Sequence, residues 1–228
     1  GCGTGHQAAE LAAAGAQVVG IDADAAMLDV ARAEHPEVAF HRVDAQDRDA
    51  VRAVVPEDGY DAVLSNAALH WMPRQDDVVA ALSDALRPGG RLVVEMGGDG
   101  NVHRVTEAIR AARREVGLDP DVRSSWTFPT PGEQAARLER NGFRVRLVGL
   151  YDRTTALSPG DTAADWARMF GAVLVDDVPH ASRAAFDHAE RADEGGGIDE
   201  GLGIDHGTRM NAVPLAGRMF ALPQLRDA

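Results

Sequence analysis

The chain has 228 residues and a formal net charge of −13, and it contains no lysine, so all 23 of its basic residues are arginines. An acidic surface disfavours non-specific binding to nucleic acid and to anionic membranes, so neither is expected as a partner. The absence of lysine also excludes a phosphate-binding P-loop, which needs a Gly-Lys pair, and Schiff-base or pyridoxal chemistry, which needs a lysine amine.

The acidic charge has two possible origins. Acid excess with lysine depletion resembles proteins from extreme halophiles, and a GC-rich genome also replaces lysine codons with arginine codons. The acid excess favours the halophilic origin slightly. No apolar run approaches the ~20 residues that span a bilayer. The single Cys2 cannot form an intrachain disulfide, so we expect a protein of the reducing cytoplasm.

A glycine-rich turn begins the chain. Gly1, Gly3 and Gly5 alternate with other residues and lead directly into an amphipathic stretch at 7–14. Glycine is needed where a backbone bends sharply, or where a ligand lies closer than a Cβ permits. A glycine turn that enters a helix is a common nucleotide-binding device, although an ordinary helix-entry loop has the same pattern.

Two predicted strands follow the turn, and each carries an acidic residue at its end. Residues 17–22 end at Asp22, and residues 38–45 include Asp44. A carboxylate at the end of a strand beside a glycine turn is placed to accept hydrogen bonds from both hydroxyls of a ribose. Asp22 could instead cap the next helix, a role that Asp24 could also fill.

Strands and helices alternate along the rest of the chain. Helices are predicted over 25–34, 47–54, 73–86, 101–117, 132–140, 162–173 and from Pro179 to about 191. Further strands are predicted over 60–71, which breaks into a polar loop, and over 91–96 and 143–150. This alternation predicts an α/β fold with a doubly wound, mostly parallel sheet that helices cover on both faces.

These motifs together resemble the class I S-adenosylmethionine-dependent methyltransferases. Within that family, the stretch SNAALHWM at 65–72 resembles the trans-aconitate methyltransferase-like, or type 11, branch. The resemblance covers residues 1–157, with a weaker echo at 217–223. It implies a Rossmann-like sheet whose last strand, at 217–222, runs antiparallel at the far side of the sheet.

One departure from the family concerns the start of the chain. The family's glycine turn follows a strand, usually central in the sheet, that ends in an acidic residue, whereas Gly1 begins this sequence. We therefore expect an N-terminally truncated piece of a longer protein that lacks the first strand. Such a piece should bind the cofactor weakly or not at all, and restoring about 35–45 upstream residues should rescue binding.

The resemblance implies a role for each cofactor-binding residue. The three glycines would let backbone approach S-adenosylmethionine, and Asp22 would take its ribose hydroxyls. Asp44 and the backbone amide of Ala45 would bind the adenine, and Asn66 would line the methionine portion. Asp44 could instead be a turn residue, and Asn66 could end its strand by side-chain bonding to backbone. Methyl transfer of this kind needs no metal.

The acceptor is expected to lie near His70 and Trp71, where this fold places acceptor-facing residues. His70 is a candidate general base if the acceptor is a hydroxyl or an amine. The alternative is a histidine that only bonds within its own loop. Trp71 would either contact the acceptor or anchor the next helix by packing.

A carboxylate acceptor would change these requirements. It is already ionised and needs no base, but an arginine should bind it, because a guanidinium fits a carboxylate. Arg153 and Arg123 are the candidates. Trp126 and Phe128 could roof the acceptor pocket or pack in the core.

Three classes of function remain open. The branch suggests methyl transfer to a small carboxylic acid, such as an aconitate-like acid or a malonyl thioester, with a quinone ring as the rival acceptor. A non-catalytic cofactor-binding module is the second class. A nicotinamide-dependent oxidoreductase is the third, and its commonest version fails because short-chain dehydrogenases use a Tyr-x-x-x-Lys pair that this chain cannot supply.

We expect one domain over residues 1–228. In it, 1–100 would bind the cofactor and 101–192 would supply acceptor contacts or a lid. Residues 193–207 contain six glycines and are expected to form a flexible loop, and 208–228 would hold the last strand and a tail.

Overall fold

The computed structural model describes residues 1–122, 125–156, 163–179 and 212–225. The chain divides into two compact units. The first unit comprises Gly1–Asp99, Thr127–Leu150 and Met219–Ala228, and the second comprises Gly100–Trp126 and Tyr151–Arg218. Each unit is described by itself below.

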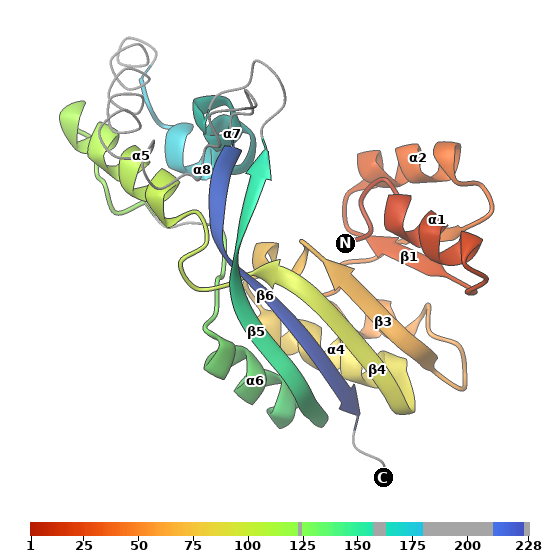
Figure 1. Cartoon of the computed structure of the whole chain (residues 1–228). Coiled ribbons are helices and arrows are strands. Elements are labelled where there is room, and N and C mark those ends of the chain that lie inside the picture. The colour runs from red at the N-terminus through yellow and green to blue at the C-terminus, as the bar shows by residue number, and fades with distance from the viewer. Residues whose placement is uncertain (123–124, 157–162, 180–211, 226–228) are drawn as a thin grey trace, which may run out of the picture. The chain divides into compact units, whose positions relative to one another are not determined.

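The first unit alternates strands and helices in the predicted order (Figure 1). Its helices are α1 His6–Ala13, α2 Ala25–Glu34, α3 Arg48–Arg52, the 3-10 turn η1 Leu69–Trp71, α4 Gln75–Ala85 and α6 Pro131–Arg140. Its strands are β1 Val19–Asp22, β2 Ala39–Arg42, β3 Tyr60–Asn66 and β4 Leu86–Gly97, together with parts of β5 Phe143–Ala156 and β6 Ala212–Leu225. Within the described ranges, no helix is both long and apolar enough to cross a membrane.

The strands form two sheets. β1 and β2 make a parallel pair, and a four-stranded sheet has the order β3-β4-β6-β5, in which β3 and β4 are also parallel. β6 runs opposite to β4 and β5, so the predicted antiparallel last strand is confirmed (Figure 1). Its predicted place at the far side of the sheet is wrong, because β6 inserts between β4 and β5. A local apolar pattern does not reveal whether a strand has one neighbour or two.

β4 begins earlier than predicted. The turn-like run at 87–90 was expected to separate α4 from a strand at 91–96, yet the strand already pairs at Leu86. Tyr60 pairs with Leu86 and Ala62 pairs with Arg91, so the intervening residues bulge out of the ladder. A proline and two glycines suit such a bulge, because they leave few ladder hydrogen bonds to lose.

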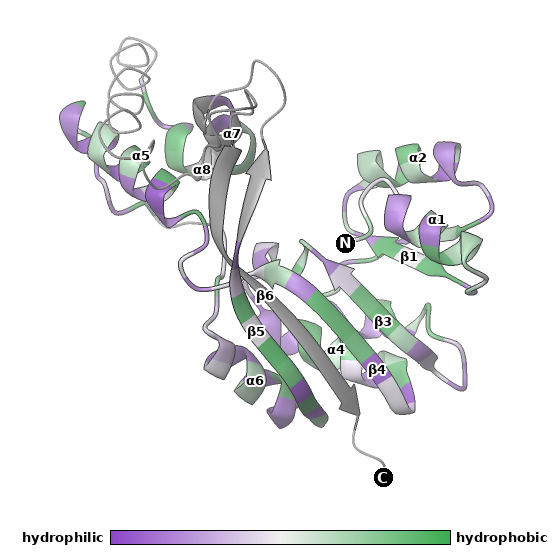
Figure 2. Ribbon diagram, in the orientation of Figure 1, coloured by the Kyte–Doolittle hydropathy of each residue, from purple (hydrophilic) through white to green (hydrophobic). Residues whose placement is uncertain are grey.

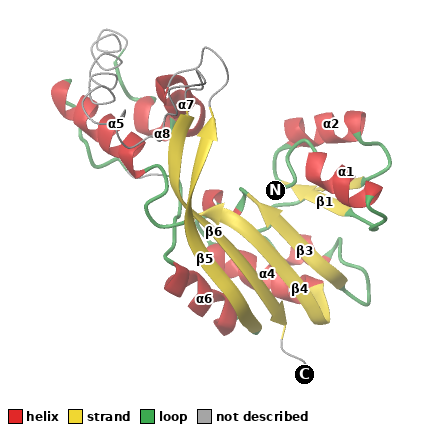
Figure 3. Ribbon diagram, in the orientation of Figure 1, coloured by secondary structure: helices red, strands yellow, loops and turns green. Residues whose placement is uncertain are grey.

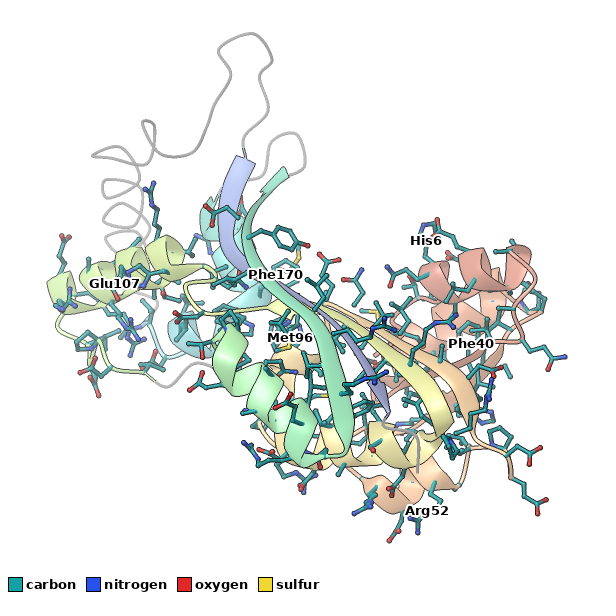
Figure 4. All side chains as sticks on the ribbon, turned by 60° about the horizontal axis from the view of Figure 1, so that its bottom comes forward. His6, Phe40, Arg52, Met96, Glu107 and Phe170 are labelled. Atoms are coloured by element: carbon teal, nitrogen blue, oxygen red, sulfur yellow. The ribbon has the colours of Figure 1, made fainter. Side chains whose placement is uncertain are left out.

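The main core of the first unit lies between the four-stranded sheet and α4 and α6, which cover the same face (Figure 3). Its fully buried side chains come from all three elements: Val78, Val79, Leu92, Val94, Met96 and Leu138. Figure 2 shows that apolar residues run along β3, β4 and the first part of β5, and Figure 4 labels Met96. Each such side chain contributes roughly 1.5–3 kcal/mol on burial.

The N-terminus of α6 carries a capping box. The Thr130 hydroxyl accepts from the Glu133 N–H at 3.2 Å, and the Glu133 carboxylate accepts from the Thr130 N–H at 2.8 Å. The Thr130 backbone hydrogen bond lowers the pKa of the Glu133 carboxyl. The predicted helix over 132–140 is confirmed, and its start follows from this pair of bonds.

Replacing Thr130 with alanine should lower the free energy of unfolding of the first unit by about 1 kcal/mol, because the helix loses a satisfied N–H at its start. Urea unfolding followed by circular dichroism measures the change. Thr130→Ser keeps the hydroxyl and should stay near wild type. Equal destabilisation by serine and alanine would show that the methyl group, not the cap, matters here.

The second unit has a small core of its own. α5 His103–Glu115 packs Ile109 and Ala112 against Leu174 and Val175 of α8 Ala172–Val175. The predicted helix over 162–173 is instead two helices, since α7 Ala163–Phe170 ends before Gly171. The predicted helix after Pro179 and the predicted loop at 193–207 lie outside the described residues.

Arg113 of α5 is buried in this unit, with a side chain only 1% exposed. Its Nε donates to the Asp119 carbonyl at 2.6 Å, and one Nη donates to the Leu174 carbonyl at 2.8 Å. Its other Nη donates to the Asp177 carboxylate at 2.8 Å. One guanidinium therefore ties α5 to the loop after it and to the turn after α8.

Candidate cofactor and acceptor site

The glycine turn is held against the end of β1. The Cys2 N–H donates to the Ile21 carbonyl at 2.9 Å, and the Gly5 N–H donates to the Cys2 carbonyl at 3.0 Å. Gly5 has φ +84° and stands as the N-cap of α1, and a Cβ there would lie 2.6 Å from the Phe40 ring. Both the backbone and the packing therefore require glycine at this position. Figure 4 labels Phe40.

Gly3 differs from Gly5 in its surroundings. It has φ +54°, and apart from Gly3 itself and its two chain neighbours no heavy atom of the described residues lies within 4 Å of where its Cβ would be. The side of the turn at Gly3 is thus open to a ligand, which is what close approach of a nucleotide to backbone requires.

Asp22 joins the glycine turn to the end of β1. One oxygen of its half-buried carboxylate accepts from the Gly3 N–H at 2.8 Å, and the other accepts from the Asp24 N–H at 2.9 Å. Asp24, not Asp22, caps α2, because its side chain accepts from the Ala26 N–H at 2.8 Å. A carboxylate has about four lone-pair positions, so Asp22 retains capacity for two ribose hydroxyls.

Asp44 lies beside Asp22 at the end of β2. The Val43 N–H donates to the Asp22 carbonyl at 2.9 Å, which joins the two strand ends. The ends of β1 and β2 therefore lie together, as a shared nucleoside site requires.

The alternative interpretation of Asp44 as a turn residue also has support. Its exposed carboxylate accepts from the Gln46 N–H at 2.9 Å, and the Asp47 N–H donates to the Asp44 carbonyl at 2.9 Å. The side chain of Ala45 packs into the main core. A turn of this kind orients the Asp44 carboxylate, whose two oxygens also accept from the Gln46 side-chain amide at 3.4 and 3.5 Å.

Asn66 ends β3, where it pairs with Glu95 of β4. Its Oδ1 is buried and accepts no hydrogen bond from the described residues, so this oxygen does not make the side-chain bond to backbone that was the alternative role of Asn66. The next residue, Ala67, has φ +55° and donates its N–H to the Glu95 carbonyl at 2.8 Å. A non-glycine residue in this region is strained, and such strain clusters at functional sites.

The end of β3 also reaches the glycine turn, because a Cβ on Gly1 would lie 2.6 Å from the Ala68 Cβ. The residues present therefore fit S-adenosylmethionine. An open glycine turn and an oriented carboxylate suit its ribose, and a buried, unpaired amide oxygen suits a donor such as its amino group. Asp22, Asp44 and Asn66 would hold it at the carboxyl ends of parallel strands.

His70 lies in η1, directly after β3, and its ring is fixed by hydrogen bonding. The Gly97 N–H donates to the His70 Nδ1 at 3.2 Å, so Nδ1 is an acceptor and the proton of the neutral ring is on Nε2. The Thr127 N–H donates to the His70 carbonyl at 2.9 Å. The ring also lies 5.7 Å from the Phe128 ring. These partners lie at the end of β4 and in the segment before α6, so the hydrogen bonds that hold His70 reach beyond its own loop.

The other acceptor candidates are placed differently. Trp71 is 40% exposed, and its ring lies 5.4 Å from that of His70. Trp126 packs against the core of the second unit, as its alternative interpretation predicted. Arg153 is part of β5, but its side chain lies outside the described part of the chain, as does the whole of Arg123.

Sequence reasoning missed two features of this region, Gln75 and the strained backbone at Ala67. Gln75 is 3% exposed, and its Nε2 donates to the carbonyls of Leu69 and Thr127. A glutamine at a helix start normally faces solvent, so no signal in the sequence marked it. The contacts of Gln75 become visible only in the folded structure, which brings the Leu69 and Thr127 carbonyls to its side chain.

A cavity of about 380 Å³ lies at the amino-terminal ends of β3 and β4 and is separate from this site. Its lining includes Arg52 and Arg87, which pair with Asp84 and Asp61, respectively. It shares no residue with the site at the carboxyl ends of the strands. Figure 4 labels Arg52.

Comparison with known proteins identifies the family. Residues 1–94 match the family model described as a methyltransferase domain. The chain is 36% identical over 203 residues to a trans-aconitate 2-methyltransferase from Methylobacterium radiotolerans, covering 86% of this chain and 76% of that protein. It is 34% identical over 166 residues to an uncharacterised methyltransferase from Schizosaccharomyces pombe, covering 69% of this chain and 62% of that protein.

The fold agrees with these matches. The crystal structure of an S-adenosylmethionine-dependent methyltransferase from Mesorhizobium loti has a TM-score of 0.53 and 17% identity to this chain, covering 98% of this chain and 88% of that one. The Rossmann-like fold predicted from the sequence is thereby confirmed. The chain belongs to the class I S-adenosylmethionine-dependent methyltransferases, in the branch that includes the trans-aconitate 2-methyltransferases.

Proposed function

We propose that this protein transfers a methyl group from S-adenosylmethionine to a carboxylate oxygen of a small organic acid, giving a methyl ester. The observation that carries this proposal is the 36% identity to a trans-aconitate 2-methyltransferase, because the match extends over 86% of the chain. It therefore includes segments beyond the cofactor-binding half, where acceptor choice is made.

The chemistry asks little of the protein beyond binding and alignment. The bound cofactor supplies an electrophilic methyl group on a sulfonium. A carboxylate oxygen forms the new C–O bond as the C–S bond breaks and its electron pair stays on sulfur, so no proton moves. Asp22, Asp44 and Asn66 would hold the donor, and the residues after β3 and β4 would align the acceptor and exclude water.

The state of His70 supports a carboxylate over a hydroxyl or amine acceptor. A general base needs a free lone pair, but Nδ1 accepts from the Gly97 N–H and Nε2 carries the proton of the neutral ring. Such a ring donates a hydrogen bond and does not take a proton. A carboxylate acceptor requires no base, so the reaction and the geometry are consistent.

The residues that would bind the acceptor carboxylates are those that the sequence analysis suggests. Arg153 would supply a guanidinium for bidentate binding, and Trp71 would contribute an apolar wall; Trp126, which packs against the core of the second unit, is the weaker candidate. These three roles are part of the proposal. They can be tested one at a time by alanine substitution once an acceptor is known.

The experiment is a methyl-transfer assay on the full-length protein with labelled S-adenosylmethionine. The acceptor panel contains trans-aconitate, other small polycarboxylic acids, a malonyl thioester and a quinol. The expected product is a methyl ester, which mild base hydrolyses to release the label. A base-stable methylated ring would instead indicate the quinone reaction. Cofactor binding without transfer to any acceptor would indicate a non-catalytic module.

A further inference from the structure

Gln75 is the first residue of α4 and one of few buried polar side chains in the described part of the first unit. Its Nε2 donates to the Leu69 carbonyl at 3.1 Å and to the Thr127 carbonyl at 3.3 Å. Both partners are acceptors only, so they fix the orientation of the amide. One side chain thus joins the turn after β3 to a segment 52 residues away in sequence.

The Leu69 and Thr127 carbonyls belong to the residue before His70 and to a residue that is hydrogen-bonded to His70. Thr127 also donates its N–H to the His70 carbonyl at 2.9 Å, and Gly97 donates its N–H to the His70 Nδ1 at 3.2 Å. The Asp99 N–H donates to the Pro129 carbonyl at 3.0 Å. The segments after β3, after β4 and before α6 are therefore joined by one set of hydrogen bonds, to which Gln75 contributes its side-chain amide.

We propose that Gln75 is a positioning residue for methyl transfer. It fixes segments 67–72 and 127–130 against each other, and so orients His70, Trp71 and Phe128 on the acceptor side of the site. It acts through these segments and does not touch the reacting atoms. The expected effect of Gln75 on turnover rests on the proposed function.

The chemistry of the site explains why glutamine is suited to this position. Two carbonyl oxygens need two N–H donors at the end of a flexible chain, and glutamine supplies both from one nitrogen. Methionine has a similar length but donates no hydrogen bond, so the Thr127 carbonyl would lose the Gln75 donor and the Leu69 carbonyl would keep the Met72 N–H at 3.0 Å. Glutamate would place carboxylate oxygens against the Leu69 and Thr127 carbonyl oxygens, which repel them. Either change should separate the two segments, and small errors in acceptor position cost as much as ~100-fold in rate.

The test compares Gln75→Met and Gln75→Glu with Gln134→Met in the full-length protein. Gln134 in α6 is also a fully buried helical glutamine, but its Oε1 accepts from Arg137 Nη1 at 2.7 Å, within its own helix. Gln134→Met is therefore a matched control for loss of a buried amide. Each variant is measured for kcat and KM of the acceptor, for S-adenosylhomocysteine affinity, and for hydrogen exchange of 67–72 and 127–130.

For Gln75→Met we expect kcat/KM for the acceptor to fall by about 10- to 100-fold, with S-adenosylhomocysteine affinity within about twofold of wild type. Hydrogen-exchange protection should fall at 67–72 and 127–130 together. Gln75→Glu should show the same pattern more strongly. Gln134→Met should lower the melting temperature without changing either the turnover of folded protein or the protection of those two segments.

Several results would overturn the inference. Wild-type-like turnover of Gln75→Met, an equal loss in Gln134→Met, or a parallel loss of cofactor affinity would each show that Gln75 only supports the core. If the wild-type protein methylates no acid, the proposed function fails separately. Hydrogen exchange, together with the ¹⁵N shifts of the His70 ring, then still decides whether Gln75 holds the two segments.

Discussion

Asp22→Ala should lower the affinity for S-adenosylhomocysteine by about 100-fold or more. Two hydrogen bonds from ribose hydroxyls to a carboxylate contribute about 1.5–3 kcal/mol each, and about 3 kcal/mol corresponds to ~100-fold in Kd. The substitution also removes the 2.8 Å bond that holds the Gly3 N–H. The glycine turn would then keep the Cys2–Ile21 backbone bond to β1 but lose the side-chain bond, which adds to the loss. Isothermal titration calorimetry on the full-length protein measures the change.

Two controls separate ligand binding from local folding. Asp22→Asn keeps one side-chain oxygen and should lose less affinity, about tenfold, because one neutral acceptor replaces a charged pair. Asp24→Ala removes the cap of α2 and should cost about 1 kcal/mol of stability with little change in affinity. If Asp22→Ala and Asp24→Ala had the same small effect on Kd, the ribose role of Asp22 would be untenable.

Arg113→Met should destabilise the second unit by about 3 kcal/mol, because each of two carbonyls left without its donor costs about 1–3 kcal/mol. The substitution leaves the carbonyls of Asp119 and Leu174 without their donor, and it removes the link between α5 and α8. Since these contacts all lie in the second unit, the first unit should remain folded. Hydrogen exchange resolved by segment would show protection lost at 103–115 and 172–178.

Asp177→Asn is the matched control, because it keeps the shape of the partner and removes its charge. The Asp177 side chain is 57% exposed, so solvent screens the pair and we expect a cost of only about 0.5–1 kcal/mol. A cost equal to that of Arg113→Met would mean that the ion pair, and not the two carbonyls, provides the stability.

The same pair predicts a pH dependence. The Arg113 hydrogen bond lowers the pKa of the Asp177 carboxyl below its ordinary value. A group whose pKa is lower in the folded state stabilises that state above its unfolded pKa, and this contribution is lost as the pH falls through the folded value. The stability difference between wild type and Arg113→Met should therefore be largest near neutral pH and shrink in acid.

Local sequence patterns predicted the elements that form the candidate cofactor site. A glycine turn before a helix and an aspartate at a strand end are local features, because backbone conformation and side-chain alternation depend on near neighbours. Asp22 therefore appeared at the predicted place beside Gly3, and Asp24 took the capping role left open between the two. The helix at 132–140 was predictable for the same reason.

Other features were decided by tertiary structure alone. The insertion of β6 between β4 and β5, the strained turn at Ala67 and the bond from Gly97 to His70 all involve partners far apart in the chain. Gln75 is the clearest case, since its role depends on a carbonyl 52 residues away. Periodicity shows which side of an element is apolar, but it does not specify which distant donor meets which acceptor. That choice arises only when the whole core packs.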